Sequence, residues 1–146
     1  MTSTQLILLV EDNPADARLT VEAFRRADSE LQIEICEDGE SALARLRDAS
    51  APLPKLILLD LNLPGIDGRE VLAALKADPN LSQVPVCILT TSRAEEDIER
   101  AYAQHTNAYV VKPVDLNDFR AAVQQIERFW LGTAEIPTPR RIAGSP

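Results

Sequence analysis

The sequence lacks the features of a secreted, membrane-bound or nucleic-acid-binding protein. Its two cysteines, Cys36 and Cys87, lie in apolar runs without a CxxC motif or a histidine cluster, so we expect small buried hydrophobic residues. No apolar run is long enough to cross a bilayer, and the short stretch Leu6–Val10 has no basic region before it. The formal net charge of −8 leaves no positive footprint for nucleic acid or an anionic membrane. We therefore expect a cytoplasmic protein that binds neither.

The sequence does contain a regular alternation of short apolar runs and longer amphipathic stretches. Most of the runs are nearly continuous leucine, isoleucine and valine, which is typical of parallel strands covered on both faces. The stretches between them carry apolar residues at helical spacing. Five strand–helix repeats predict a doubly wound α/β domain with a five-stranded parallel sheet and five helices. The apolar runs cover residues 5–10, 32–37, 55–60, 84–90 and 108–111.

Several local signals predict where the helices begin and end. Asn13 before Pro14 indicates an N-cap and a first helical residue, and Asp78-Pro79 indicates the end of the third helix. Residues 92–95 (SRAE) fit a capping box for the fourth helix. The fifth helix is predicted from an apolar stripe formed by Leu116, Phe119, Val123, Ile126 and Trp130.

The helical pattern stops after Leu131. The remaining residues contain three prolines, two glycines and an arginine pair, and they show no periodicity. We therefore predict one domain over residues 1–131 and a flexible tail over residues 132–146.

Polar residues follow the predicted strands where a doubly wound fold gathers its functional groups. Glu11-Asp12 follow the first strand, Asp60 ends the third, Thr90 ends the fourth and Lys112 follows the fifth. Carboxylates brought together repel one another, and a divalent cation relieves this repulsion. Oxygen ligands favour magnesium, calcium or manganese over zinc.

These residue types suit phosphoryl chemistry. An aspartate at a strand end can attack phosphorus and form an acyl phosphate. The new phosphoryl oxygens then need compensating groups, which a magnesium ion, the Lys112 ammonium and the Thr90 hydroxyl could supply. These residue types are therefore consistent with a strand-end aspartate that accepts a phosphoryl group with the help of a divalent cation.

Five segments, in order, resemble the receiver domains of response regulators in two-component systems. They are residues 10–13 (VEDN), 59–68 (LDLNLPGIDG), 89–92 (LTTS), Tyr109 and 111–113 (VKP), and the likeness covers residues 5–131. The resemblance implies a flavodoxin-like fold with strand order 2-1-3-4-5. It also implies a single-domain response regulator that signals by a conformational switch and protein contact. Such a protein catalyses only its own phosphorylation and dephosphorylation, so we do not expect an enzyme in the ordinary sense.

The resemblance also implies a metal site. Asp12 would be a direct magnesium ligand together with the phosphoacceptor Asp60. Glu11 would act nearby, through water, and the backbone carbonyl of Asn62 would be a further ligand.

Three residues on or directly after the later strands would serve the phosphoryl group and the switch. Lys112 would pair with the phosphoryl oxygens, and its bond to Pro113 would be a cis peptide. Thr90 and Tyr109 would form the switch pair, whose side chains rearrange once Asp60 is modified.

The resemblance further implies a phosphohistidine on a sensor histidine kinase as the phosphoryl donor. Phe129-Trp130-Leu131 and the proline-containing tail resemble the single-domain receivers that pair with bacterial phytochrome kinases, which are often dimers. Because a helix cannot bury adjacent positions on one narrow face, Phe129 and Trp130 indicate either a wide apolar face against the sheet or a homodimer contact. His105 is interpreted as a solvent-facing or helix-terminus residue.

Three other functions are consistent with parts of the pattern. A phosphatase of the haloacid dehalogenase kind would need a second aspartate where Asn62 stands. A flavin or nucleotide carrier would need a glycine- or hydroxyl-rich turn in place of residues 11–14 (EDNP). A pseudo-receiver, which acts as an interaction module without phosphorylation, is the main alternative, although such proteins typically lose the acceptor aspartate, an acidic partner or the lysine.

Overall fold

The computed structural model describes residues 5–27, 31–138, 140 and 141. Five parallel strands form one sheet in the order β2-β1-β3-β4-β5, which confirms the predicted fold. The strands are β1 (Leu6–Val10), β2 (Gln32–Cys36), β3 (Leu56–Leu59), β4 (Val86–Thr90) and β5 (Ala108–Val111). The helices are α1 (Pro14–Ala27), α2 (Gly39–Arg47), α3 (Gly68–Ala77), α4 (Glu95–Ala103) and α5 (Leu116–Glu127), and a π-helical turn η1 (Arg128–Thr133) follows α5.

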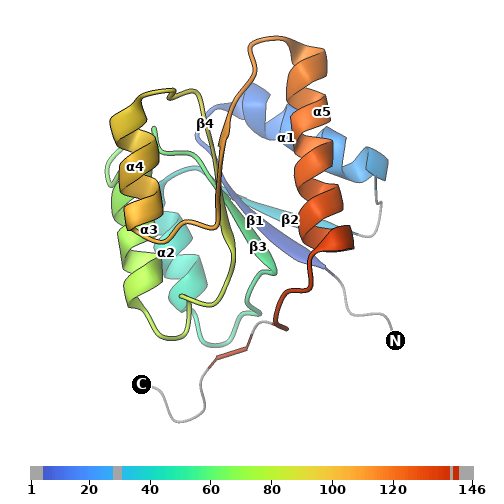
Figure 1. The fold of residues 1–146 in the computed structure, drawn as a ribbon. Helices are drawn as coiled ribbons and strands as arrows, with labels where there is room; N and C mark the ends of the chain where they lie inside the picture. The colour runs from blue at the N-terminus through green and yellow to red at the C-terminus, as the bar shows by residue number, and fades with distance from the viewer. Residues whose placement is uncertain (1–4, 28–30, 139, 142–146) are drawn as a thin grey trace.

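The helices cover both faces of the sheet. Helices α1 and α5 lie on one face, while α2, α3 and α4 lie on the other (Figure 1). Each face has its own apolar core, one including Phe24 of α1 and Val123 of α5, the other including Leu46 of α2 and Leu72 of α3. The inner strands β1, β3 and β4 are buried throughout, whereas the edge strands β2 and β5 are only partly covered.

Most predicted helix boundaries agree with the structure. The Asn13 side chain accepts hydrogen bonds from the backbone N–H groups of Ala15 (2.9 Å) and Asp16 (3.1 Å), as an N-cap does. Helix α3 ends at Ala77, directly before Asp78. None of the helices in the described part of the chain has the length and apolar character that a membrane span needs.

The predicted capping box of the fourth helix is wrong. Helix α4 begins at Glu95, after Ala94, which gives no side-chain cap. The Ser92 hydroxyl accepts from the Ala94 N–H (3.3 Å) and donates to the Asp97 carboxylate (2.5 Å). Ser92 therefore belongs to the loop before α4, because its hydroxyl is engaged by a side chain of the first helical turn.

The predicted cis bond between Lys112 and Pro113 is also wrong, because all described peptide bonds are trans. The Lys112 N–H donates to the Thr90 carbonyl (2.6 Å), which extends the β4–β5 pairing by one residue and already directs Lys112 toward the carboxyl edge. His105 has a φ of 69°, and its N–H bonds to the Tyr102 carbonyl (3.0 Å). This geometry confirms His105 as a helix-terminus residue.

The end of α5 differs from a plain apolar stripe. Phe119, Val123 and Ile126 are buried as predicted, but Leu116, the first residue of the helix, is 59% exposed. Trp130 packs against the core shared by α1 and α5. Phe129 is 51% exposed, and its ring meets that of Trp130 edge-on at 5.1 Å between centroids.

Two residues of the segment after η1 contact the rest of the domain. The Arg140 carbonyl accepts a hydrogen bond from the Gln83 side chain (2.7 Å). The Arg141 guanidinium donates to the carbonyls of Asp48 (2.6 Å) and Ala51 (3.3 Å) in the loop between α2 and β3. The flexible tail over residues 132–146 stays a prediction, and residues 139 and 142–146 lie outside the described residues.

Candidate functional site

The carboxyl ends of β1, β3 and β5 bring charged side chains to one edge of the sheet. Val10 of β1 pairs in register with Leu59 of β3, so the residues that follow them, Glu11 and Asp60, lie side by side. The Asp60 N–H donates to the Val10 carbonyl (3.1 Å), which fixes this arrangement. Glu11 and Asp60 are buried, at 3% and 6% exposure, which is unusual for carboxylates without a partner.

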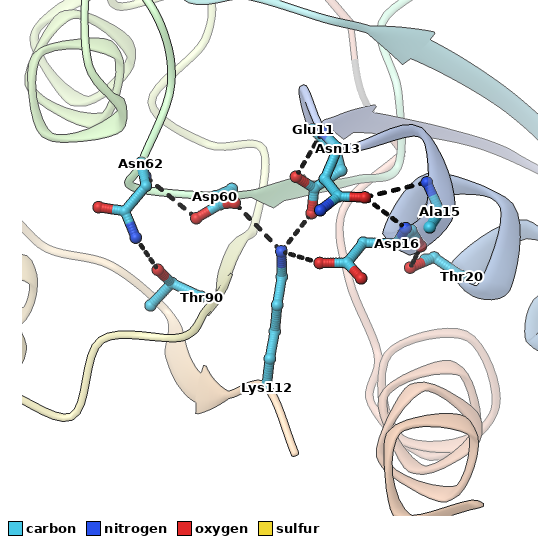
Figure 2. A network of polar contacts seen from close by, with 9 residues as sticks. All are labelled: Glu11, Asn13, Ala15, Asp16, Thr20, Asp60, Asn62, Thr90 and Lys112. Carbon is cyan, nitrogen blue, oxygen red and sulfur yellow. Dashed lines mark hydrogen bonds and ion pairs between the residues drawn. The ribbon is translucent and has the colours of Figure 1, made fainter. Parts of the chain in front are cut away.

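Their partner is Lys112 from the end of β5. Its ammonium donates to Glu11 Oε1 (2.5 Å), Asp16 Oδ2 (2.9 Å) and Asp60 Oδ2 (3.1 Å), as Figure 2 shows. An ammonium has three donor hydrogens, and these three carboxylates use all of them. Burial alone would lower the pKa of Lys112, but the hydrogen bonds to Glu11 and Asp16 and the charge of Asp60 outweigh it and raise the pKa.

Asp16 is the residue of this network that the sequence did not reveal. It lies in the first turn of α1, where acidic residues are common because they complement the helix dipole. Nothing in its local sequence therefore distinguishes it from an ordinary helix-start residue. Its contact with Lys112 arises only because α1 packs beside the carboxyl end of the sheet.

Glu11, Asp12 and Asp60 form a cluster that could hold a metal ion. Each offers a carboxylate oxygen, and these atoms lie within 4.8 Å of one another. Burial raises the pKa of Glu11 to about 7, although Lys112 pulls it the other way. Since Lys112 supplies one positive charge to several carboxylates, the cluster has an excess of negative charge that a divalent cation would neutralise. Its all-oxygen ligand set suits magnesium, manganese or calcium.

Hydroxyl and amide groups complete the other side of Asp60. The Asn62 N–H donates to Asp60 Oδ1 (3.0 Å), and its side-chain amide donates to the Thr90 hydroxyl (3.4 Å), which is fully buried (Figure 2). Tyr109 does not bond to Thr90 but to the loop that follows it: the Tyr109 hydroxyl donates a hydrogen bond to the Ser92 carbonyl (3.0 Å). The structure thus brings the predicted metal, phosphoryl and hydroxyl groups together and connects Tyr109 to the loop that follows Thr90.

A buried carboxylate beside an ammonium, a hydroxyl and an acidic cluster that could hold a cation is consistent with phosphoryl transfer. In agreement with this chemistry, the family model of the response regulator receiver domain matches residues 7–124, and the chain belongs to that family. The family is one of two-component signalling domains rather than of conventional enzymes.

The chain is similar over most of its length to two response regulators, Rcp1 and RcpA. Response regulator Rcp1 of Synechocystis is 45% identical over 137 residues, which cover 91% of this chain and 93% of Rcp1. The crystal structure of the phosphorylated cyanobacterial phytochrome response regulator RcpA is 46% identical, with a TM-score of 0.90 over 92% of this chain and 99% of that one. A Mn(2+)-bound form of Rcp1 superimposes with a TM-score of 0.87 at 45% identity, over 91% of this chain and 99% of that one. Its bound metal is consistent with the acidic cluster found here.

Proposed function

We propose that Asp60 accepts a phosphoryl group from a phosphohistidine of a sensor histidine kinase. The observation that carries this proposal is the environment of its buried carboxylate. One oxygen contacts the Lys112 ammonium at 3.1 Å and the other accepts from the Asn62 N–H at 3.0 Å. A carboxylate oxygen would attack phosphorus as the bond from phosphorus to the imidazole nitrogen breaks, and that nitrogen keeps the electron pair.

The chain's own groups would orient the acceptor and compensate the charge it gains. Lys112 would transfer one of its hydrogen bonds to a phosphoryl oxygen, and the Thr90 hydroxyl would donate to another. The carboxylates of Asp12, Asp60 and Glu11, with the Asn62 carbonyl, would hold Mg²⁺. The ion supplies positive charge to the phosphoryl oxygens when it is bound.

Thr90 and Tyr109 are proposed as the switch. Thr90 ends β4, and its backbone continues into the loop whose Ser92 carbonyl holds the Tyr109 hydroxyl. A movement of the Thr90 hydroxyl toward a phosphoryl group would displace that loop and change the hydrogen bond between the Tyr109 hydroxyl and the Ser92 carbonyl. The change would then reach the surface formed by α4, β5 and α5, where a partner protein could bind.

The relatives suggest the kind of kinase. RcpA is named as a phytochrome response regulator, and AtBRR, a bacteriophytochrome response regulator of known structure, is 37% identical with a TM-score of 0.71 over 95% of this chain and 100% of that one. We therefore propose a bacterial phytochrome kinase as the donor, in the cytoplasm. The net charge of −8 supports signalling by protein contact without nucleic acid or membrane.

The first experiment is phosphorylation by acetyl phosphate, read by intact mass. We expect the wild-type protein to gain one phosphoryl group when Mg²⁺ is present, and none when EDTA is added. Asp60→Asn should gain none under either condition, because the amide cannot form the acyl phosphate. Asp118→Asn, which alters an exposed acid on α5, is the matched control and should behave as wild type.

Failure to phosphorylate is informative in two ways. If no phosphoryl group appears with acetyl phosphate, phosphorylated phytochrome kinases should be tried as donors. Uptake from a kinase would retain the proposal, whereas no uptake from any donor would leave the pseudo-receiver function. Uptake by Asp60→Asn equal to wild type would show that Asp60 is not the acceptor.

We also propose a homodimer through η1, the turn that follows α5 and carries Phe129 and Trp130. Phe129 is 51% exposed beside the half-buried Trp130, and a large exposed aromatic side chain is a typical interface anchor. We expect a dimer at tens of micromolar, and we expect Phe129→Ala to raise its dissociation constant by about tenfold or more. Analytical ultracentrifugation measures both.

A second exposed aromatic residue supplies the control for this prediction. Tyr102 on α4 is also 51% exposed, so Tyr102→Ala removes a comparable ring at a different place. This variant should dimerise as the wild type does. A monomeric wild type at tens of micromolar, with and without phosphorylation, would refute the dimer.

A further inference from the structure

A chain of polar contacts outside the acidic cluster joins α3 to the loop that carries Ser92. The Arg69 guanidinium on α3 forms an ion pair with Asp97 on α4, with Nη2 at 2.8 Å and Nε at 3.1 Å from the same carboxylate oxygen. The other oxygen of Asp97 accepts the Ser92 hydroxyl at 2.5 Å. The Ser92 carbonyl in turn accepts the Tyr109 hydroxyl at 3.0 Å. This series of contacts therefore connects Arg69 of α3 to Tyr109, the proposed switch tyrosine.

We propose that Arg69 and Asp97 are positioning residues that hold the loop between β4 and α4. In this position the Ser92 carbonyl keeps its hydrogen bond from the Tyr109 hydroxyl, and the Tyr109 ring stays packed against the core. The inference rests on the proposed function, because it assigns to this ion pair the control of the Thr90–Tyr109 switch. Neither residue hydrogen-bonds to Asp60 or to the acidic cluster, and the hydrogen-bonded path from this pair to Tyr109 runs through Ser92.

The ion pair is better protected than an ordinary surface pair. The side chains of Arg69 and Asp97 are only 23% and 18% exposed, so solvent screens them less than it screens a fully exposed pair. Arg69 is also within 3.6 Å of Asp67, the N-cap of α3, which limits the directions it can take. The hydrogen bonds from Ser92 and Arg69 lower the pKa of Asp97, consistent with a carboxylate that stays charged as an acceptor.

Among the described residues, Ser92 supplies the side-chain hydrogen bond that joins this loop to the first turn of α4. Helix α4 begins without a side-chain cap at Ala94, so the Ser92 side chain is what ties the loop to the first turn of the helix. Ser92 lies only two residues after Thr90. A displacement of Thr90 toward a phosphoryl group therefore pulls on Ser92. The Arg69–Asp97 pair, which holds Ser92 through Asp97, opposes that movement.

The position of Tyr109 can be measured without phosphorylating the protein. The chain has two tyrosines, so incorporation of 3-fluorotyrosine gives two ¹⁹F resonances, and Tyr102→Phe assigns them. Tyr102 is 51% exposed, and it provides the solvent-like reference. In Arg69→Ala and in Asp97→Ala we expect the Tyr109 resonance to shift toward that reference. Arg69→Lys should restore most of the wild-type position, because a cation is retained.

Two further variants separate this role from general loosening. Arg45→Ala breaks an ion pair of similar length, Arg45–Glu34 at 2.6 Å, on the opposite edge of the sheet, and it should leave the Tyr109 resonance unchanged. The double variant Arg69→Ala with Asp97→Ala should shift the resonance no further than either single variant, since both remove the same contact. An unmoved Tyr109 resonance in both single variants would overturn the inference, and equal shifts in Arg45→Ala would do so too. Because neither metal nor phosphodonor is present, failure of Asp60 phosphorylation would not produce either result.

Discussion

Lys112→Met is expected to lower the free energy of unfolding by about 3–5 kcal/mol when no divalent cation is present. Methionine keeps an unbranched apolar stem but removes the ammonium that contacts Glu11, Asp16 and Asp60. The side chains of Glu11 and Asp60 are 3% and 7% exposed, so water cannot replace the lost partner. Either two buried carboxylates would then repel each other, or Glu11, whose pKa burial already raises to about 7, would have to bind a proton. Urea denaturation in EDTA, followed by circular dichroism, measures the loss.

The same variant should regain stability when Mg²⁺ is added. A cation that binds only the folded state stabilises it by mass action, and the cluster of Glu11, Asp12 and Asp60 is more negative without the lysine. Mg²⁺ should therefore stabilise Lys112→Met more than it stabilises wild type. A loss below about 1 kcal/mol in EDTA would mean that proton binding relieves the buried carboxylates at little cost, and would contradict the prediction.

Asp16→Asn is the matched control for this experiment. It removes one charged partner of Lys112 and leaves Glu11 and Asp60 in contact with the ammonium. We expect a loss of about 1 kcal/mol, because a hydrogen bond to a partly exposed charge is weakened and no buried charge is left alone. A loss as large as that of Lys112→Met would show that Asp16, and not the buried pair, dominates the network.

Gly68→Ala is expected to cost about 3 kcal/mol of stability and to slow phosphorylation by about a hundredfold. A Cβ atom at Gly68 would meet the Asp60 carbonyl oxygen at 2.2 Å and the Leu61 Cα at 2.5 Å, and both are backbone atoms that no rotamer change can move. Helix α3 or the strand end that carries Asp60 must therefore shift. Since Asp60 is the proposed acceptor, a displacement of its backbone misplaces the reacting oxygen.

The control for this prediction is Gly132, where an added Cβ atom would have free space. Gly132→Ala places its Cβ where no atom lies within 4 Å, so stability and phosphorylation should stay at wild-type values. Urea denaturation and intact-mass time courses with acetyl phosphate measure both effects. Wild-type stability and rate in Gly68→Ala would show that the contact between α3 and the end of β3 yields easily.

The structure also explains why Gly68 is more than a turn residue. Its pattern, Asp67-Gly68, predicts a turn and a helix start, and Asp67 does cap α3 by accepting from the N–H groups of Arg69 and Glu70. The requirement for glycine comes instead from the close approach of α3 to the backbone at Asp60. No local pattern contains that distance, because the two segments meet only after the helix packs on the sheet.

Several features could be predicted because their causes are local. Continuous apolar runs specify the inner strands, Asn13 specifies the start of α1, and polar residues placed directly after strands must lie at the carboxyl edge of a parallel sheet. The two local predictions that failed, the capping box at Ser92 and the cis bond before Pro113, concern residues that bond to partners outside the predicted patterns. Ser92 is engaged by Asp97, and Lys112 is aligned by the Thr90 carbonyl.

The sequence by itself determined the class of fold, the strand-end positions of Glu11, Asp60 and Lys112, and their chemistry. Only the tertiary structure decided which further side chains join them. Asp16 and Lys112 are 96 residues apart in sequence, and Arg69 and Asp97 are 28 apart, each pair on different elements. Their contacts depend on how α1 sits beside the end of β5 and how α3 sits beside α4. Packing of the two apolar cores sets these relations, and no short-range pattern of residues records them.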